Sequence, residues 1–458
     1  MHKINPSMTE GPLFGKMMLY TVPLMLTGLL QLLFNAADLV IVGQFGDSGS
    51  NAVAAVGCTG SISALFINFF IGCSAGSGVT VAHGIGANNR VAVHKAVHTI
   101  IPLAIVGGIV ISVLGYFLAR PVLVLMSTPD NILDLSVIYM EITFLGMLPN
   151  MIYNFGASVL RAAGDSKRPL YYLVAAGVLN VALNLFFVIV LHLDVAGVAL
   201  ATLIAHVLSA ILVLRALIKR DDLCKLEIRK LRFYAEPLKK IFRMGIPAGI
   251  QSSLFAISNV IIQSSINALE TIYVGVVAGN AAAQNLQNFA FITCESFKQT
   301  AMNYTGQNVG CQKYERVKKI SYIAIGGVAV SSIIVGTLMT LFSKPLLGIY
   351  ISDSPEAIKW GAVRMVCMCL PYFMGGVMDV TTGILRGMGK SIFPMFASIM
   401  GVCGLRIVWI YTIFRIPQYH TPESLWISYI ITWTFTAVVQ IIVLAVTLNK
   451  KIRRESLR

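Results

Sequence analysis

Charged residues are scarce in this chain of 458 residues. Asp, Glu, Lys and Arg together make up 12% of it, whereas hydrophobic residues make up 56%. Its mean hydropathy is +0.77. A water-soluble surface of this size needs more charge than that, so the soluble globular class is excluded and an integral membrane protein is predicted.

Metal-binding and nucleotide-binding motifs are also lacking. The sequence contains no HExxH, no Walker-type phosphate loop and no CxxC, and its eight cysteines have no repeated metal-ligand spacing. Six of the cysteines lie inside apolar runs, as small core residues do: Cys58, Cys73, Cys294, Cys367, Cys369 and Cys403. We therefore expect no metal cluster, no cofactor and no enzyme active site.

One enzyme-like pattern is present. Gly72 to Gly76 reads GCSAG, which matches the GxSxG that carries the nucleophile of many hydrolases on a strand-to-helix turn. Here the pattern lies inside an apolar run, and the nearest histidine, His83, is half a helical rotation away. This placement favours close packing of another helix against Gly72 and Gly76.

The chain repeats one long segment. Pro23 and Asn35 recur as Pro247 and Asn259 at an offset of 224 residues. Further on, LRAAGDSKRP (160–169) matches LRGMGKSIFP (385–394) at an offset of 225. Chance similarity between apolar stretches aligns leucines but rarely prolines, glycines and arginines, so the pattern indicates an internal duplication.

Apolar runs long enough to cross the membrane as helices recur in both copies. We predict twelve spans, at residues 16–42, 52–80, 97–119, 136–159, 170–191, 197–217, 244–268, 276–302, 320–342, 360–384, 393–414 and 425–448. The first run is too long for a signal-peptide core and lacks a small-residue cleavage site, so no removable leader is expected.

The predicted fold class is an all-α polytopic membrane protein with two six-helix bundles. An even number of helices in each copy makes both enter the membrane the same way up, which predicts a pseudo-two-fold axis along the membrane normal and a cleft between the lobes. The expected domains are an N-terminal lobe (1–214), a basic cytoplasmic linker (215–243) and a C-terminal lobe (244–458) with a basic tail. The linker is interpreted as a solvated tether with an amphipathic piece on the membrane surface.

Basic residues are concentrated on alternate connections between the spans. They are Arg90, Lys95, Arg161, Lys167, Arg168, the stretch 313–319, Arg386, Lys390, Lys450, Lys451, Arg453 and Arg454, together with the linker. The other connections carry mostly acids, namely Asp47, Asp130, Asp134, Asp194, Glu270, Asp353, Glu356 and Glu423, with Arg120, Lys344, Lys359 and Arg415 as exceptions. Lys and Arg stay cytoplasmic, so we expect both termini in the cytoplasm and a place in the inner membrane. This asymmetry and anionic lipid explain the net charge of +15 without a nucleic-acid partner.

Ionisable residues within the spans are few, and their cost in a bilayer makes them candidates for function. They are Asp38, Glu295, Lys298, Arg364, Asp379 and Arg406. At 1.5 Å per residue, Asp38 falls in the same depth band as Thr202, Asn184 and Asn180. Asn180 and Asn184 share a helix face, so two amide oxygens, a hydroxyl and a carboxylate can converge and hold a proton or sodium. Two alternatives stay open: the Asn and Thr side chains bond neighbouring helices, or Asp38 points outward to water.

Motifs along the whole chain resemble those of the multidrug and toxic compound extrusion (MATE) family. They are NAADLVIVG, GIGANN, GQNVG, the paired LRAAGDS and LRGMGKS, and LNVALNLFFVI followed by VAGVALAT. The resemblance implies twelve helices in two bundles that export cationic, amphipathic compounds in exchange for inward sodium or protons. It also implies a cation site at Asp38, Asn180, Asn184 and Thr202, and a bend of the first helix at Pro23.

The C-terminal copy departs from the family pattern. Sodium-coupled members carry acids where this chain has Phe255 and Gly375, and Asp379 stands one turn beyond the second position. The residues of a candidate polar site in this lobe are Gln251, Asn259, Glu295, Asp379 and Arg406, with Lys298 or Arg406 as neutralising partners of the acids. A structural ion pair is an equally good interpretation.

The expected function is secondary active efflux by alternating access, in a protein that is a monomer. The expected partners are small cationic or amphipathic compounds, H+ or Na+, and membrane lipid. A flippase for lipid-linked precursors of the same superfamily is the first alternative, although charges in this chain are sparse for such a cleft. A membrane-embedded enzyme is the second, but no nucleophile, base or metal cluster lies at one depth.

Overall fold

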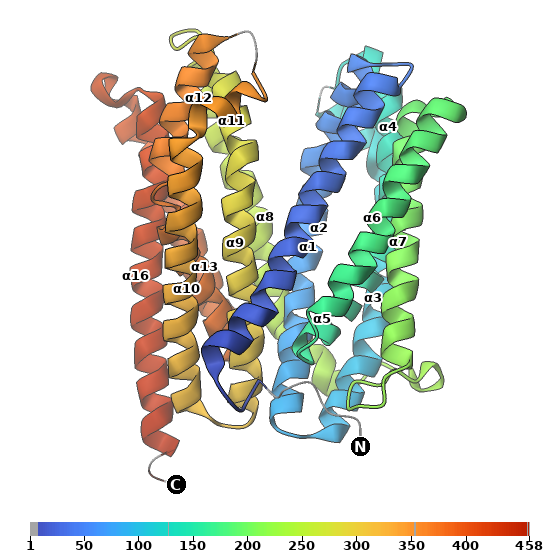
Figure 1. Ribbon diagram of the computed structural model, residues 1–458, viewed down its shortest axis with the longest axis vertical. Coiled ribbons are helices and arrows are strands. Elements are labelled where there is room, and N and C mark those ends of the chain that lie inside the picture. The colour runs from blue at the N-terminus through green and yellow to red at the C-terminus, as the bar shows by residue number, and fades with distance from the viewer. Residues whose placement is uncertain (1–7, 127, 352–353, 456, 458) are drawn as a thin grey trace. The chain divides into compact units, whose positions relative to one another are not determined.

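The computed structural model describes residues 8–126, 128–351, 354–455 and 457, with the side chains of all of these except 50, 61, 62 and 64. The regular elements of this part of the chain are all helices (Figure 1). Asp353, one of the acids predicted on the outer connections, lies outside the described residues, as do the first seven residues of the predicted N-terminal lobe.

The contacts of the described residues divide the chain into two compact units. Unit 1 contains residues 22–249, and unit 2 contains residues 8–21 and the part from residue 250 onwards. The helices α1, Leu13–Phe45, and α8, Ala235–Ala268, therefore each belong to both units. In both helices the change of unit falls beside a proline, Pro23 in α1 and Pro247 in α8.

Each unit is built around long helices. Besides its part of α1 and α8, unit 1 contains α2 (Ser50–Gly86), α3 (Arg90–Leu125), α4 (Asp130–Leu145), α5 (Met147–Ala162), α6 (Lys167–Leu185), the π-helical η1 (Phe186–Val190), α7 (Asp194–Ile218) and the 3-10 turn η2 (Ile228–Lys230). Unit 2 adds α9 (Val276–Gly310), α10 (Tyr314–Leu341), α11 (Ser343–Gly348), α12 (Pro355–Met368), α13 (Tyr372–Gly387), α14 (Ile392–Ser398), the π-helical η3 (Ile399–Gly404), α15 (Leu405–Tyr411), the turns η4 (Ile413–Arg415) and η5 (Pro417–Tyr419), and α16 (Pro422–Glu455).

Most of the predicted spans reappear as membrane-length helices. Within the described residues nine helices are long and apolar enough to cross a membrane, and two bent pairs, α4 with α5 and α12 with α13, raise the number to eleven. The predicted span 276–302 corresponds to α9, which has 35 residues but several amides in its first half. These helices confirm the all-α polytopic fold class.

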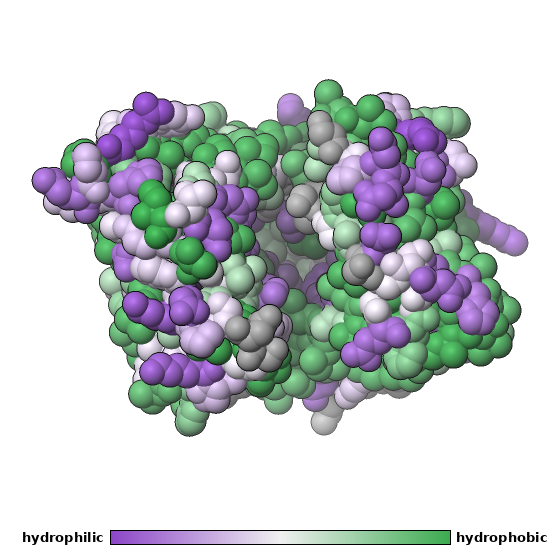
Figure 2. Space-filling view, turned by 90° about the horizontal axis from the view of Figure 1, so that it is seen from above, coloured by the Kyte–Doolittle hydropathy of each residue, from purple (hydrophilic) through white to green (hydrophobic). Residues whose placement is uncertain are grey.

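Apolar side chains cover the outer faces of the helices. On α16 an exposed stripe recurs every three or four residues: Ile427, Ile431, Phe435, Val438, Ile442 and Val446. Figure 2 looks onto one end of the helices and shows hydrophilic residues on the end faces and hydrophobic residues around their margins. An apolar stripe of this length is stable in hydrocarbon and unfavourable in water.

The bends within the two broken spans fall at equivalent positions of the repeat. The helices α4 and α5 meet at 41° around Gly146, and α12 and α13 meet at 48° just before Tyr372. The helices after the bends begin at Met147 and Tyr372, an offset of 225. The duplication thus extends from sequence to helix geometry.

Glycines of α2 allow α8 to approach closely. A Cβ on Gly72 would lie 2.6 Å from the backbone of Gly249, and one on Gly76 would lie 2.5 Å from the nitrogen of Gly245. Side chains at these positions would separate the two helices. The interpretation of GCSAG as a helix-packing motif is confirmed.

The interpretation of the linker as a solvated tether is wrong. Cys224 and Leu226 are buried, at 1% and 2% exposure, in the hydrophobic core of unit 1. The backbone N–H of Glu227 donates to His98 Nε2 over 3.0 Å, and that of Tyr234 donates to Thr99 Oγ1 over 3.2 Å. Buried apolar residues and backbone bonds fix the segment between α7 and α8 onto α3, and its one helical piece is the short turn η2.

Candidate functional site

Unit 1 brings four of the predicted polar residues together. Asn184 Nδ2 donates to Asp38 Oδ1 over 2.5 Å, and the Thr202 hydroxyl also bonds to the Asp38 carboxylate. Asn180 Nδ2 donates to Thr202 Oγ1 over 3.2 Å. Asp38 is therefore joined to α6 and α7 and does not point outward to water.

The local helix geometry explains this convergence. Asn180 and Asn184 stand four residues apart on α6, and Asn184 Nδ2 lies 3.4 Å from Asn180 Oδ1. Side chains at this spacing lie one above the other on the same helix face. Both amides are buried, at 5% and 0% exposure, so the carboxylate faces a polar and largely dehydrated surface.

One oxygen of this cluster has its bonding capacity unused. Within the described residues, the buried Asn184 Oδ1 has no hydrogen-bond partner. A rotation of the amide by half a turn would direct Oδ1 at Asp38, which is favourable only when a proton or metal cation lies between the two oxygens. The set of carboxylate, amide and hydroxyl oxygens is of the hard type that suits a proton or an alkali cation.

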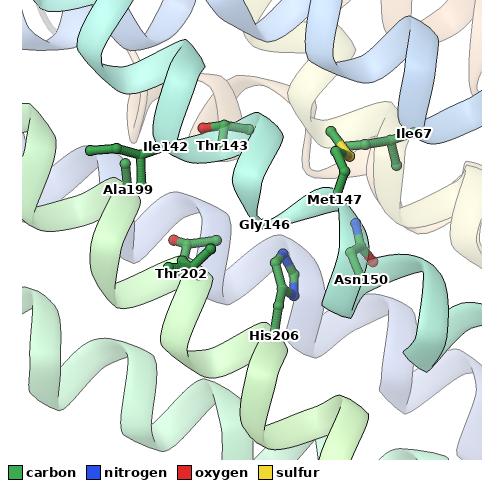
Figure 3. Close-up of a pocket in the computed structure, with 10 residues that line it drawn as sticks. Ile67, Ile142, Thr143, Gly146, Met147, Asn150, Ala199, Thr202 and His206 are labelled. Carbon is green, nitrogen blue, oxygen red and sulfur yellow. The ribbon is translucent and has the colours of Figure 1, made fainter. Parts of the chain in front are cut away.

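A small cavity adjoins the cluster at the bend between α4 and α5. It has a volume of about 30 Å³, and Thr202 lines it together with Gly146, Asn150 and His206. Figure 3 shows His206 and Thr202 projecting from α7 toward Gly146 and Asn150. A cavity of this size holds a water molecule, so Thr202 lies between Asp38 and a space that water can enter.

Tyr139 of α4 also lies near this cluster, although no sequence pattern singled it out. It hydrogen-bonds Thr143 and lies within electrostatic range of Asp38. A tyrosine in an apolar run is usually interpreted as core or as an interfacial residue. Only the approach of α4 to α1 in the fold brings its hydroxyl toward the carboxylate.

Pro23 lies inside an unbroken helix. The α1 helix continues from Leu13 to Phe45 through this proline. The proline removes the hydrogen bond that an N–H here would give to the carbonyl of Leu19. On the C-terminal side of the proline, the hydroxyl of Thr27 donates to the Pro23 carbonyl over 2.7 Å, so this backbone oxygen has a side-chain partner.

The predicted residues of the C-terminal lobe fall into separate clusters. Gln251 Nε2 donates to Ser398 over 3.0 Å, and its Oε1 accepts from Arg386 over 2.8 Å. Asn259 accepts a hydrogen bond from the Tyr429 hydroxyl over 3.2 Å. The structure does not bring Gln251 and Asn259 into one site.

One of the two acids of this lobe, Glu295, has a basic partner from its own helix. Lys298 and Glu295 form an ion pair one turn apart on α9. Asp379 of α13 lies within electrostatic range of Lys298, Glu295 and Arg386. These two acids and two bases form a compact group of near-neutral total charge.

Arg406 is not the neutralising partner of these acids, contrary to one of the expectations. Its guanidinium lies 3.7 Å above the centre of the Tyr429 ring, and its Nε donates to Thr432 over 3.3 Å. The offset of α15 from α9 and the aromatic residues of α16 direct the side chain away from Glu295. Lys298 has the partnering role that the sequence left open between the two bases.

Comparisons with known proteins agree with this architecture. The model of the MatE family matches residues 23–186 and 247–412. "Probable multidrug resistance protein YoeA" of Bacillus subtilis is 26% identical over 434 residues, covering 92% of this chain and 91% of the relative. "Probable multidrug resistance protein YpnP" of the same organism is 26% identical over 398 residues, covering 87% and 88%. A solved MOP superfamily transporter from Pyrococcus furiosus superposes with a TM-score of 0.90 at 19% identity, over 98% of this chain and 99% of that one.

Proposed function

The chain belongs to the MatE family of multidrug efflux transporters, and on that premise we propose that it is a secondary active exporter of cationic, amphipathic compounds. Export would be driven by H+ or Na+ moving inward through unit 1. The protein would lie in the cytoplasmic membrane with both termini inside the cell, and work as a monomer. Members of this family are transporters, which leaves no need for a catalytic role.

The hydrogen-bonded group around Asp38 carries this proposal. Asp38 accepts from Asn184 and Thr202, while the buried Asn184 Oδ1 is unused among the described residues. An arriving cation would take the place of the amide hydrogens, and the amide would turn its oxygen to it. Asp38 would therefore either bind the ion or keep its hydrogen bonds, but not both. A coupling site requires such mutually exclusive states.

The energy for export enters with the ion. Moving one elementary charge inward across the membrane releases about 2.3 kcal/mol per 100 mV of potential. Export of a singly charged cation costs the same amount, so exchange of one charge for one charge is driven by the concentration gradient of the ion. Ion binding at Asp38 would change the bonds between α1 and α6, and α1 would bend at Pro23, where one backbone hydrogen bond is already missing. Alternation between two states of α1 would then open the route for the exported compound on one side at a time.

The test is ion-driven export by vesicles that contain the purified protein. Asp38→Asn keeps the shape of the side chain but removes its charge, and we expect ion-driven export of a cationic dye to fall by at least about tenfold. Asp47→Asn is the matched control, because the Asp47 side chain is 63% exposed and pairs with His192 at the surface. Separate pH jumps and sodium jumps would identify the coupling ion.

Export by the Asp38→Asn protein at the original rate would contradict the proposal. Movement of labelled lipid headgroups without dye export would support the flippase instead.

A further inference from the structure

Two arginines of unit 2 are buried without a carboxylate beside them. Arg364 is 5% exposed and Arg406 is 3% exposed. In the described part of the chain no ion pair includes either residue, and the titratable groups within electrostatic range of Arg364 are Tyr429, Cys369 and Tyr372. A buried positive charge without a counter-ion is unfavourable, and a bound anion would relieve it.

The partners of Arg364 are all neutral. Its Nη1 donates to the backbone oxygen of Asn280 over 2.6 Å and to the side-chain Oδ1 of Asn280 over 2.7 Å. Its Nη2 donates to Gln287 Oε1 over 3.0 Å. The buried Nε has no hydrogen-bond partner among the described residues. One donor of the guanidinium is thus left for a ligand.

This arginine lines a cavity of about 10 Å³ inside unit 2. Other residues of its wall are Ile262, Gln263, Asn280, Trp426 and Tyr429. Trp426 Nε1 and the Arg364 Nη1 both donate to Asn280 Oδ1, so the amide is fixed at the wall. The guanidinium of Arg406 lies above the ring of Tyr429, which adds a second positive charge behind the wall. A space of this volume holds about one water molecule, so a halide ion or a carboxylate end group would enter with small shifts of the wall side chains.

The internal repeat shows that the two units have opposite charge at equivalent places. The offset of 224 that relates Pro23 to Pro247 carries Asp38 onto Ile262. The offset of 225 that relates the starts of α4 and α12 carries Tyr139 onto Arg364. Asp38 and Tyr139 approach each other in unit 1, and Ile262 and Arg364 line one cavity in unit 2. The acid-centred cluster of unit 1 thus corresponds in position to an arginine-lined cavity in unit 2.

We propose that the cavity of unit 2 lined by Arg364 and Ile262 is a binding site for an anion, either a halide ion or the carboxylate group of an organic solute. The free Nε of Arg364 donates to the anion, and the nearby Arg406 stabilises its charge. The proposal does not depend on the role of Asp38 or on the coupling ion.

The experiment measures the melting temperature of the full-length protein in detergent at constant ionic strength. Sodium methanesulfonate, whose anion is neither a halide nor a carboxylate, is replaced stepwise by sodium chloride or by sodium acetate. A bound anion stabilises the folded protein, and at a hundred times its Kd we expect the melting temperature to rise by about 3 °C. A response to chloride alone assigns the site to halides, and a response to acetate assigns it to carboxylates.

Two variants remove the site in different ways. Arg364→Gln removes the charge, and Ile262→Asp keeps Arg364 but supplies a carboxylate from inside the cavity. In both, the rise in melting temperature should be lost. If Arg364→Gln fails to fold, Ile262→Asp alone decides. Arg415→Gln is the matched control, since this exposed arginine stacks on Tyr411 outside the cavity, and its response should equal that of the wild type.

The proposal is overturned if the wild type melts at the same temperature in all three salts, or if Ile262→Asp keeps the full response. Either result would make Arg364 a structural residue satisfied by amide oxygens. The Asp38→Asn protein should keep the response to the anion, so this proposal and the proposed ion-driven export can fail separately.

Discussion

At the scale of single residues, the Asn184 amide is the closest partner of Asp38 in the proposed coupling site. With its amide hydrogen directed at Asp38, the residue supplies a donor over 2.5 Å, and with its oxygen directed there it supplies a ligand for a cation. The helix α6 fixes the position of the side chain but not which end of the amide faces the acid. In the proposed mechanism one residue would thus serve both the loaded and the empty state.

A second residue-scale feature is the pair of Arg220 and Asp222 after α7. Burial raises the pKa of Asp222, but the hydrogen bonds and charge of Arg220 outweigh it and hold the pKa below its usual 3.8. Because the pKa is lower in the folded protein, the pair contributes its full stability above about pH 4 and loses it as the pH falls through the folded pKa.

We expect Asp222→Asn to lower the free energy of unfolding at pH 7 by about 1–2 kcal/mol, a modest value because Asp222 is partly exposed. At a pH below the folded pKa of Asp222 the variant and the wild type should differ little, since the acid of the wild type is then protonated in both the folded and the unfolded protein. Thermal melting of the variant and the wild type at the two pH values measures this difference in stability. Asp221→Asn is the control, because the Asp221 side chain is 80% exposed and forms a surface ion pair with Lys225. Equal losses at both pH values would contradict the argument.

The residues of unit 1 were easier to predict than those of unit 2 for a physical reason. Asp38, Asn180, Asn184 and Thr202 converge because helix periodicity and depth place them together, and both can be read from a sequence. In unit 2 the partner of each charge depends on side-chain direction. Arg406 has the right depth for Glu295 but stacks on Tyr429, and that choice follows from the packing of α16.

At the scale of elements, α1 is the helix that changes shape in the proposed mechanism. Pro23 stands where α1 passes from unit 2 to unit 1. Pro23→Ala would restore the missing hydrogen bond to Leu19 and stiffen the helix, so we expect unchanged or higher melting temperature and export slowed severalfold. Pro102→Ala, a proline inside α3 of unit 1, is the control. Export at the wild-type rate by Pro23→Ala would show that α1 need not bend.

The contact of α2 with α8 gives a stability prediction. Gly76→Ala would bring a Cβ to 2.5 Å from the nitrogen of Gly245 and 2.6 Å from the oxygen of Ile241, neither of which is a flexible side chain. We expect a loss of about 1–3 kcal/mol in the free energy of unfolding. Gly60→Ala on the same helix meets nothing within 4 Å and should be neutral or slightly stabilising. Equal melting temperatures for the two variants would argue against close packing.

The sequence predicted the helices better than their breaks. Runs of apolar residues identify a span, and every predicted range overlaps a helix of the described chain. The bend at Gly146 is followed by Pro149 in the first turn of α5, but the apolar run continues through both residues, so the span 136–159 was predicted as one helix. The prediction for the linker was wrong for the opposite reason. Its charges suggested a solvated segment, but two of its apolar residues, Cys224 and Leu226, are buried.

At the scale of the whole molecule, the distribution of basic residues predicts the orientation in the membrane. A green fluorescent protein fused after Arg458 should fluoresce, because that end is expected in the cytoplasm. Alkaline phosphatase at the same place should be inactive, whereas phosphatase fused after Asp47, between α1 and α2, should be active. An active phosphatase at the carboxyl end would reverse the predicted orientation.

Because α1 and α8 each contribute residues to both units, neither half of the chain contains a complete unit. A chain cut between α7 and α8 would leave unit 1 without residues 235–249 and unit 2 without residues 8–21. Neither fragment would contain all of its own fold. An ancestral protein with a single copy of the repeat would have completed itself only as a pair of identical chains, each lending the other the start of its first helix.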